Sequence, residues 1–376
     1  MTRAESQKLM DVIGGAEKQS LFVGGCVRNQ LLNKQVDDID IATQFKPEAI
    51  IKKLEAAGVK GVPTGIDHGT VTAVVAGKPY EITTLREDVA TDGRHAEVKF
   101  TDDWVKDAAR RDFKMNTLLA DIEGNIYDPI GQGLADLKAQ RVVFVGDPTA
   151  RIAEDYLRIL RFFRFHAFYG QGEMDAAALK ACADTAEHIS TLSRERVTSE
   201  LLKILSVGHA AGILKIMFDH NVLREISDSK YQDAVLQKLC DLQRDHDAQD
   251  VVARLFVIGG NKPKFYDDVL RLTHSQKNFL VKLDMAYDTA LYADDKALKK
   301  AIFYHGNDLL LQGYLLLAAN GQVKVDRTLI DILKNWQAPA CPITGEDLLA
   351  EGYQTGPELG QELVRRQEEW LKENLV

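Results

Sequence analysis

Two acidic residues, Asp38 and Asp40, stand at a spacing that suits metal-assisted chemistry on a phosphate. Side chains alternate along a β-strand, so both carboxylates would share one face, roughly 7 Å apart along it. Ile39 and Ile41 would point the other way, into a core. Carboxylate oxygens held side by side suit a hard cation such as Mg²⁺. We therefore expect Asp38 and Asp40 to hold metal for in-line phosphoryl or nucleotidyl transfer.

A glycine pair precedes these aspartates and could cradle phosphates. The apolar run at residues 21–23 predicts a buried strand, which Gly24 and Gly25 interrupt. Glycine has no Cβ, so the backbone can turn sharply and lie close to a ligand. A short helix should follow, with Arg28 adding a bidentate charge to unpaired peptide N–H groups. The ordinary alternative is an unrelated turn followed by a solvated strand end.

Two further stretches are expected beside this pair. Residues 69–76 and 80–85 predict a hairpin, on which Glu81 is either a third carboxylate of the site or an exposed strand residue. Residues 86–96 carry both charge signs without periodicity, which predicts a mobile loop of the kind that covers active sites.

Residues 107–120 predict a helix whose centre carries Arg110, Arg111, Asp112 and Asn116. Asp112 and Asn116 are four residues apart and would share a helix face. An Asp and an Asn on one face could grip a ribose. A solvated face with salt bridges is the alternative.

Residues 147–169 predict a long helix with Asp147 as its N-cap. Asp155 and Arg158 lie one turn apart, off its apolar stripe. They can pair with each other, or they can present acceptors and donors to the edge of a base. Arg161, on the same helix, joins them as a candidate nucleotide-binding residue.

The whole chain has 376 residues and a net charge of −9, ordinary for a globular protein of two or more domains. Residues 141–145 give the last strand signal, and nearly everything beyond predicts helices, on which basic residues are scattered. The four cysteines are far apart without a Cys-x-x-Cys pair, which fits a reducing compartment. The sequence has no apolar run of membrane-spanning length and no signal sequence, so we expect a cytoplasmic protein with no membrane association.

With these motifs in place, the sequence resembles the class II tRNA nucleotidyltransferases, the CCA-adding enzymes of the DNA polymerase β superfamily. The likeness covers nearly the whole chain in ordered motifs, at residues 24–29 with 38–40, 68–70, 81–86, 110–116, 128–131, 154–158, 193–196, 344–347 and 356–360. In that family the motif at 110–116 recognises the ribose. In the Glu-Asp-x-x-Arg motif at 154–158, Asp155 and Arg158 would be the protein template that selects C and A.

The resemblance implies an α+β fold with a mixed α/β, polymerase β-like nucleotidyltransferase head at residues 1–140. A helical neck with the base-selecting motif (141–205) and a helical, tRNA-binding body and tail (206–376) would follow. The implied activity is template-independent addition of C, C and A to the tRNA 3′ end from CTP and ATP, with release of pyrophosphate. The partners would be tRNA, CTP and ATP, and no obligate protein partner is evident.

The resemblance also implies roles for the candidate residues. Mg²⁺ on Asp38 and Asp40 would be the cofactor, with Glu81 as the third catalytic carboxylate. The nucleotide would be bound by Gly24, Gly25, Arg28, Arg110, Arg111, Asp112, Asn116, Asp155, Arg158 and Arg161. One residue departs from the family pattern, because Asn29 stands where the family usually has Asp. The change keeps the size of the side chain and removes a charge next to Arg28.

Other functions fit parts of the pattern. A poly(A) polymerase or a partial CC- or A-adding enzyme of the same family is the nearest, although the full-length stretch at 86–96 favours the complete reaction. A non-catalytic RNA-binding protein on this scaffold is an alternative of another class, which the presence of both Asp38 and Asp40 disfavours. A fused phosphohydrolase domain is disfavoured because the sequence has no histidine cluster, His246-Asp247 being its only His-Asp pair.

Overall fold

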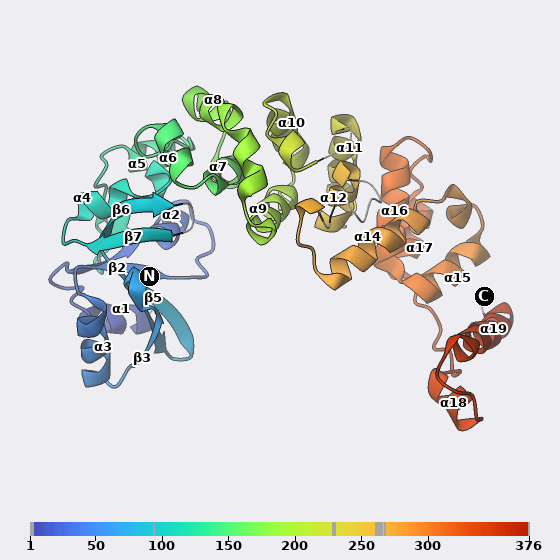
Figure 1. Cartoon of the computed structure of the whole chain (residues 1–376). Coiled ribbons are helices and arrows are strands. Elements are labelled where there is room, and N and C mark those ends of the chain that lie inside the picture. The colour runs from blue at the N-terminus through green and yellow to red at the C-terminus, as the bar shows by residue number, and fades with distance from the viewer. Residues whose placement is uncertain (1–3, 93–94, 228–230, 260–265, 267, 375–376) are drawn as a thin grey trace. The chain divides into compact units, whose positions relative to one another are not determined.

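The computed structural model describes residues 4–92, 95–227, 231–259, 266 and 268–374, and Figure 1 labels its elements. The chain divides into two compact units. The first comprises Met1–Glu200 with Asp219–Glu225, and the second comprises Leu201–Phe218 with Ile226–Val376. All strands of the described chain belong to the first unit, and the described part of the second unit is helical.

A mixed seven-stranded sheet forms the centre of the first unit, in the order β3-β4-β5-β2-β1-β8-β9. The pair β2–β5 is parallel, and the other neighbours in this sheet are antiparallel. The predicted α+β class, with a mixed head followed by helices, is confirmed, as is the expected hairpin, which is β4–β5. The strands are β1 (Ser20–Val23), β2 (Asp40–Thr43), β3 (Lys60–Gly65), β4 (Thr70–Val75), β5 (Lys78–Thr84), β8 (Leu119–Ala120) and β9 (Ile126–Tyr127).

The first unit also contains helices, and the sequence pattern did not indicate all of its elements. Strand β3 and helix α5 were not predicted; the start of α5 is held by the Asp128 carboxylate, which accepts from the backbone N–H of Gly131 and Leu134 at 3.0 Å. The helices of the first unit are α1 (Ala4–Val12), α2 (Gly25–Leu31), α3 (Pro47–Ala56), α4 (Trp104–Ala109), α5 (Gly133–Lys138), α6 (Pro148–Glu154), α7 (Leu157–Tyr169), α8 (Ala176–Asp184) and part of α9 (Arg194–Ser206). Short 3₁₀ turns are η1 (Ile66–His68), η2 (Lys114–Asn116), η3 (Ala186–Thr191) and η4 (Leu223–Glu225).

The stretch at 86–96 is not the irregular loop that its charges suggested. Its described residues belong to a two-stranded antiparallel sheet of β6 (Arg86–Asp92) and β7 (His95–Phe100). Main-chain hydrogen bonds hold such a ribbon together whatever the side-chain pattern, which is why mixed charges misled the prediction. Residues 141–145 are likewise not a strand. Phe144 makes one isolated bridge with Phe113, and its buried ring packs 4.8 Å from that ring, so this apolar run serves an aromatic core.

The predicted helix at 107–120 is also wrong. Helix α4 ends at Ala109, and the chain passes through the 3₁₀ turn η2 into β8. Phe113 is fully buried with an extended backbone (φ −118°, ψ 144°), and its N–H donates to the Asp112 carboxylate at 2.8 Å. Asp side chains compete in this way with helical hydrogen bonds, so the motif forms a turn instead of a helix.

The predicted helix at 147–169 is two helices, α6 and α7, separated at Asp155. Asp147 caps α6 as expected, accepting from the N–H of Ala150 at 2.8 Å. Asp155 leaves the helical region (φ −156°, ψ 104°), and its carboxylate accepts from the N–H of Leu157 at 3.1 Å. Asp155 therefore lies at the break and not on a helix face shared with Arg158.

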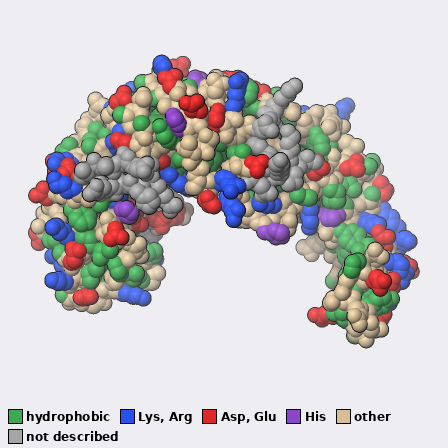
Figure 2. Space-filling view, viewed as in Figure 1, with side chains coloured by type: hydrophobic (Ala, Val, Ile, Leu, Met, Phe, Trp, Pro, Cys, Tyr) green, Lys and Arg blue, Asp and Glu red, His purple; other side chains and the backbone are tan. Residues whose placement is uncertain are grey.

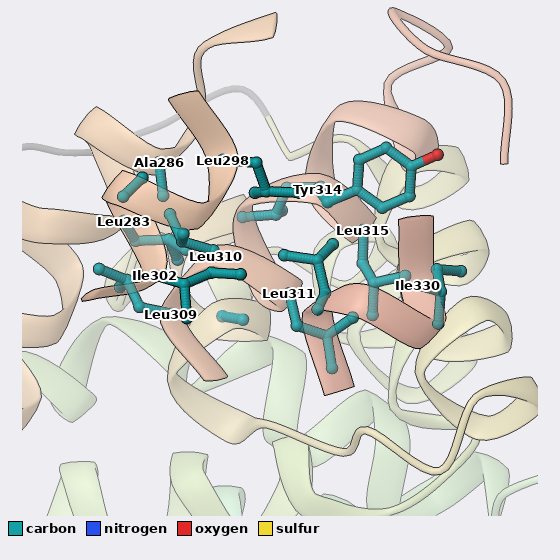
Figure 3. Close-up of a cluster of buried hydrophobic side chains, with 14 of the residues drawn as sticks. Leu283, Ala286, Leu298, Ile302, Leu309, Leu310, Leu311, Tyr314, Leu315 and Ile330 are labelled. Carbon is teal, nitrogen blue, oxygen red and sulfur yellow. The ribbon is translucent and has the colours of Figure 1, made fainter. Parts of the chain in front are cut away.

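The second unit is built around α16, which is largely apolar and buried from Leu309 to Ala319, as expected for a central helix. Figure 3 shows its side chains packed among those of α14, α15 and α17. No helix in the described ranges is both long and apolar enough to cross a membrane. The helical remainder was predicted apart from α14 and α18. The elements are α10 (Ala210–Asp219), α11 (Asp233–Asp245), α12 (Val251–Gly259), α14 (His274–Ala286), η5 (Thr289–Tyr292), α15 (Asp295–His305), α16 (Asn307–Ala319), α17 (Arg327–Asn335), α18 (Gly345–Ala350) and α19 (Pro357–Asn374).

Candidate active site

A cavity of about 450 Å³ in the first unit brings most of the sequence-predicted residues together. Asp40 contributes to its wall, whereas Asp38 and Glu81 do not. The predicted nucleotide-binding residues that line it are Gly24, Gly25, Arg28, Arg110, Arg111, Asp112, Asn116, Asp155, Arg158 and Arg161. The structure therefore gathers four separate motifs around one space large enough for a small polar ligand.

The glycine turn leads from the buried strand β1 into α2. Gly24 has a φ of 71°, in the left-handed region that glycine adopts without strain. A Cβ on Gly24 would lie 3.4 Å from Arg111 Nη1, so a side chain here would crowd the cavity wall. The turn thus exposes bare backbone to the cavity beside Arg28, a residue that is only 7% exposed.

The acidic residues form a looser group than the sequence suggested. Strand β2 begins at Asp40, so Asp38 lies in the exposed segment before it and not on the strand. Asp40 is the register neighbour of Glu81, because β2 and β5 run parallel. Burial raises the pKa of Asp40, and the nearby charge of Glu81 raises it further, partly opposed by Arg111. A bound cation would stabilise the ionised form of Asp40 against both effects.

These residues fit a magnesium ion only in part. Among the described residues, no three His, Cys, Asp or Glu side chains are arranged as a ready metal cage. Mg²⁺ is usually bound by one or two carboxylates and completed by water and substrate phosphates. Asp40 can supply one such carboxylate, and Asp38, two residues away on an exposed segment, can supply a second.

Asp112 is the buried centre of a polar network. Its Oδ1 accepts from Asn116 Nδ2 at 2.9 Å, and its Oδ2 accepts from Arg161 Nε at 2.9 Å. Burial alone would raise the pKa of Asp112, but the charge of Arg161 together with the hydrogen bonds from Asn116, Arg161 and the Phe113 N–H outweigh it and hold the pKa below its usual value. Asp112 and Asn116 therefore meet as expected, although through a 3₁₀ turn and not along a helix face.

The side chains of Asp155 and Arg158 do not bond to each other, although the backbone N–H of Arg158 donates to the Asp155 carbonyl at 2.9 Å. Asp155 Oδ2 accepts from Arg196 Nη2 at 2.6 Å, while Arg158 Nη1 donates to Glu154 and to the Arg151 carbonyl at 2.7 Å. Each of the two candidate base-selecting residues is thus held by a different partner at the cavity wall.

Sequence reasoning assigned no role to Leu157, Phe165 and Arg196, which also line the cavity. Arg196 belongs to the motif at 193–196, so that motif was the available signal. Leu157 and Phe165 occupy ordinary apolar positions of a helix, so the sequence does not indicate that they line a site.

Basic residues of the second unit are scattered, as expected. Lys299 pairs with Asp295 at 3.0 Å, and Lys300 pairs with Glu368 at 2.6 Å. Figure 2 shows basic and acidic side chains interspersed on the visible face. Lys262 and Lys264, two further basic residues of this half of the sequence, lie outside the described residues.

Comparison with known proteins connects this geometry to a family. The family described as "Poly A polymerase head domain" matches residues 20–143, and that described as "Probable RNA and SrmB- binding site of polymerase A" matches residues 173–228. The cavity draws residues from the first match and from the helices that follow it.

Relatives cover the chain almost from end to end. The Danio rerio protein named CCA tRNA nucleotidyltransferase 1, mitochondrial, is 35% identical over 93% of this chain and 83% of its own. The CCA-adding enzyme of Streptococcus sanguinis is 33% identical over 95% of this chain and 90% of its own. The solved Bacillus stearothermophilus CCA-adding enzyme in complex with CTP shares the fold, with a TM-score of 0.72 at 24% identity over 98% of this chain and 93% of its own. The chain therefore belongs to the CCA tRNA nucleotidyltransferase family, the CCA-adding enzymes.

Proposed function

We propose that this nucleotidyltransferase adds C, C and A to the 3′ end of tRNA, using CTP and ATP and releasing pyrophosphate. The observation that carries the proposal is the single cavity that holds the glycine turn, Asp40 and the Asp155–Arg158 motif together. A phosphate-binding end, a carboxylate and a base-selecting end are the parts that such a transfer requires.

The triphosphate would lie against the glycine turn and the arginines. Arg110 and Arg111 share Asp107 as their partner, at 2.8 and 3.0 Å, which fixes both guanidinium groups at the cavity wall. Guanidinium groups bind phosphate bidentately, so pre-positioned arginines gain affinity with little loss of side-chain freedom. The ribose would meet Asp112 and Asn116.

Asp38 and Asp40 would hold Mg²⁺, with Glu81 beside Asp40 as the third catalytic carboxylate. When bound, the ion neutralises triphosphate charge and promotes deprotonation of the attacking hydroxyl. Asp40 would orient the tRNA 3′-hydroxyl toward the α-phosphate. The hydroxyl proton passes to solvent, the new bond joins this oxygen to the α-phosphorus, the bond to the β-phosphate oxygen breaks, and pyrophosphate carries away the electron pair.

Base choice would follow from Asp155 and Arg158. A carboxylate accepts and a guanidinium donates, which complements the amino group and ring nitrogen of C and of A. U and G carry a carbonyl where C and A carry the amino group, so the carboxylate would be left without a donor. Poly(A) polymerase or partial CC- or A-addition remains the alternative within the family, and the presence of the β6–β7 segment favours the full reaction.

The chain would work as a head at residues 1–140, a neck at 141–205, and a body and tail at 206–376 that hold the tRNA. Its cysteines Cys26, Cys182, Cys240 and Cys341 are free, which supports a reducing compartment such as the cytoplasm.

The deciding experiment incubates the purified protein with Mg²⁺ and tRNA that lacks CCA, together with CTP, ATP or both. Sequencing the 3′ ends should show CC with CTP alone and CCA with both nucleotides. Ends that stop at CC with both nucleotides, or that carry A tracts, would identify the partial enzyme or the poly(A) polymerase. Binding of tRNA without any extension would identify a non-catalytic RNA-binding protein.

A further inference from the structure

Arg28 differs from the other arginines of the cavity in what holds it. Within the part of the chain that the structure describes, no carboxylate lies at ion-pair distance from Arg28, and its hydrogen bonds go to neutral oxygens. The charge of Asp112 acts on Arg28 from beyond ion-pair distance, but that carboxylate is already bonded to Arg161. Arg28 therefore brings a positive charge into the cavity that forms no ion pair with a described carboxylate. The other cavity arginines do have carboxylate partners: Asp107 for Arg110 and Arg111, Glu154 for Arg158, Asp112 for Arg161, and Asp155 for Arg196.

Tyr169, the last residue of α7, holds this cation in two ways. Arg28 Nη2 donates to Tyr169 Oη at 2.7 Å, and Arg28 Cζ lies 4.0 Å from the centroid of the Tyr169 ring. The second distance is that of a cation–π contact, which attracts a guanidinium group without neutralising it. The contacts join α2 to the end of α7, two helices that are far apart in the sequence (Figure 1).

Asn29 closes a triangle with Arg28 and Tyr169. Its Oδ1 accepts from Arg28 Nε at 3.1 Å and Nη2 at 2.9 Å, and also from Tyr169 Oη at 3.2 Å. Its Nδ2 donates to the Gln35 carbonyl at 3.1 Å, which fixes the amide with its oxygen toward Arg28. A carboxylate at this position would form a bidentate ion pair with Arg28. The amide orients the guanidinium group and leaves its charge available to a ligand.

We infer that Tyr169 is a positioning residue that aims Arg28 at the phosphates of the incoming nucleotide, with Asn29 sharing that role. The inference rests on the proposed function for the identity of the ligand. An oligophosphate that enters the cavity supplies the anion that Arg28 lacks, and the attraction is strong where water is scarce. Tyr169 acts through Arg28, because its hydroxyl is already shared between Arg28 and Asn29.

The test compares Tyr169→Phe, which keeps the ring, with Tyr169→Leu, which removes both contacts. Tyr127→Phe is the matched control, because Tyr127 also lies near a cation, with Lys18 Nζ 5.4 Å from its ring, and donates to Asp121 away from the cavity. Calorimetry measures binding of inorganic tripolyphosphate to the full chain, and steady-state kinetics measures KM and kcat for CTP. A melting curve accompanies each variant.

We expect Tyr169→Phe to weaken tripolyphosphate binding about threefold to tenfold, and Tyr169→Leu about tenfold to a hundredfold, as loss of a hydrogen bond to a charged group would. KM for CTP should rise in parallel, with a smaller change in kcat. Tyr127→Phe should stay within about twofold of the parent chain. Unchanged binding and KM in Tyr169→Leu, with a lowered melting temperature, would overturn the inference and leave Tyr169 a structural residue.

Asn29→Asp gives an independent reading, since it adds a carboxylate without changing size. We expect it to weaken tripolyphosphate binding several-fold by pairing with Arg28. Equal or tighter binding would contradict the role of the neutral amide, and a parent chain that binds no tripolyphosphate would overturn the inference altogether. If Tyr169 governs tripolyphosphate binding but tRNA gains no C or A, the proposed function fails while the positioning role stands.

Discussion

Arg196 donates a 2.6 Å hydrogen bond to the carboxylate of Asp155, and so joins the first turn of α9 to the break between α6 and α7. The other oxygen of the same carboxylate accepts from the N–H of Leu157 at 3.1 Å. Asp155 is therefore held at both oxygens before any ligand is present. Arg158 is held separately, by Glu154, so the two candidate base-selecting residues have independent supports.

Asp155→Ala should lower the use of CTP and ATP and relax the rejection of UTP and GTP, and Arg158→Ala should do the same. Each variant removes one member of a donor–acceptor pair that fits C and A but leaves U and G with an unpaired polar group. Losing one such pair changes discrimination by about 1–3 kcal/mol, or roughly tenfold to a hundredfold. Incorporation of all four nucleotides into tRNA measures the effect. A lower melting temperature with an unaltered nucleotide ranking would mean that the residues only brace the helices.

Arg196→Ala should reproduce part of the effect of Asp155→Ala on nucleotide selection while leaving the Asp155 carboxylate in place. The carboxylate would keep its bond to Leu157 and lose the guanidinium group that orients its second oxygen. We expect selectivity for CTP over UTP to fall by less than in Asp155→Ala, about threefold to tenfold. The double variant should resemble Asp155→Ala alone, because residues in one network are not additive. Full additivity of the two changes would show that Arg196 acts independently of Asp155.

Asp112→Ala should weaken discrimination against deoxynucleotides. Asp112 is 8% exposed, and it orients Asn116 and Arg161 at the cavity wall, so its loss disturbs every candidate contact to the sugar. The kcat/KM ratio for CTP against dCTP should fall about tenfold, the size expected for one hydrogen bond of about 1.4 kcal/mol. Arg161→Ala distinguishes a direct contact between Asp112 and the 2′-hydroxyl from an indirect effect of Asp112 through Arg161. If Asp112 meets the 2′-hydroxyl itself, Arg161→Ala keeps the ratio, and an unchanged ratio in Asp112→Ala would exclude the sugar role.

The parts of the fold that local chemistry fixes could be predicted from the sequence. The strand, glycine turn and short helix around Gly24, and the Asp147 cap of α6, depend on neighbours within a few residues. The parts that were wrong depend on distant partners. Phe113 is drawn out of a helix by an aromatic core that includes Phe144 and Phe162, and Asp155 bonds to Arg196.

The same reasoning explains which site residues escaped notice. The motifs identified Arg28, Asp112 and Asp155 as site residues, because each stands in a stretch rich in polar residues. Tyr169 stands in an aromatic helix, and only the folded chain brings its hydroxyl to Arg28, 141 residues away in sequence. A single sequence carries no pattern for such a contact.

Asp121 should make the first unit sensitive to acid. Its carboxylate accepts from Asn125 Nδ2 at 2.9 Å and Tyr127 Oη at 2.7 Å, as well as from backbone N–H groups of the β8–β9 turn. Burial opposes ionisation, but these donors lower the pKa of Asp121 to about 2. Against an unfolded value near 3.9, the difference corresponds to on the order of 2 kcal/mol of stability.

That stability is fully present above about pH 4 and is lost as the pH falls toward about 2, because the folded pKa is the lower one. Asp121→Asn should therefore reduce the free energy of unfolding by about 1–3 kcal/mol at pH 7 and flatten its fall between about pH 4 and pH 2. Urea titrations across this range measure it, with the exposed Asp67→Asn as control. A parallel fall in the variant and the parent chain would show that other carboxylates govern the acid response.

Asp40→Ala and Asp38→Ala should each abolish nucleotide addition while tRNA binding survives. Asp40 lines the cavity beside Glu81, and Asp38 adds a second carboxylate on the adjoining segment. Removing a ligand of a catalytic metal loses several kcal/mol of transition-state stabilisation, or at least about a hundredfold in rate. Asp37→Ala is the matched control, since Asp37 is an exposed acidic residue of the same segment that bonds to Gln35.

Metal binding can be measured independently of catalysis. Mn²⁺ can replace Mg²⁺ at oxygen ligands, and its paramagnetic resonance signal counts the bound ions in the presence of CTP. We expect Asp40→Ala and Asp38→Ala to lose bound Mn²⁺, Glu81→Gln to retain it with weaker affinity, and Asp37→Ala to match the parent chain. The effects of Asp40→Ala and Glu81→Gln on Mn²⁺ binding should differ, because Asp40 lies at the cavity wall whereas Glu81 is only its neighbour on β5. Near-normal nucleotide addition and full Mn²⁺ binding in either aspartate variant would show that the metal is held by other residues.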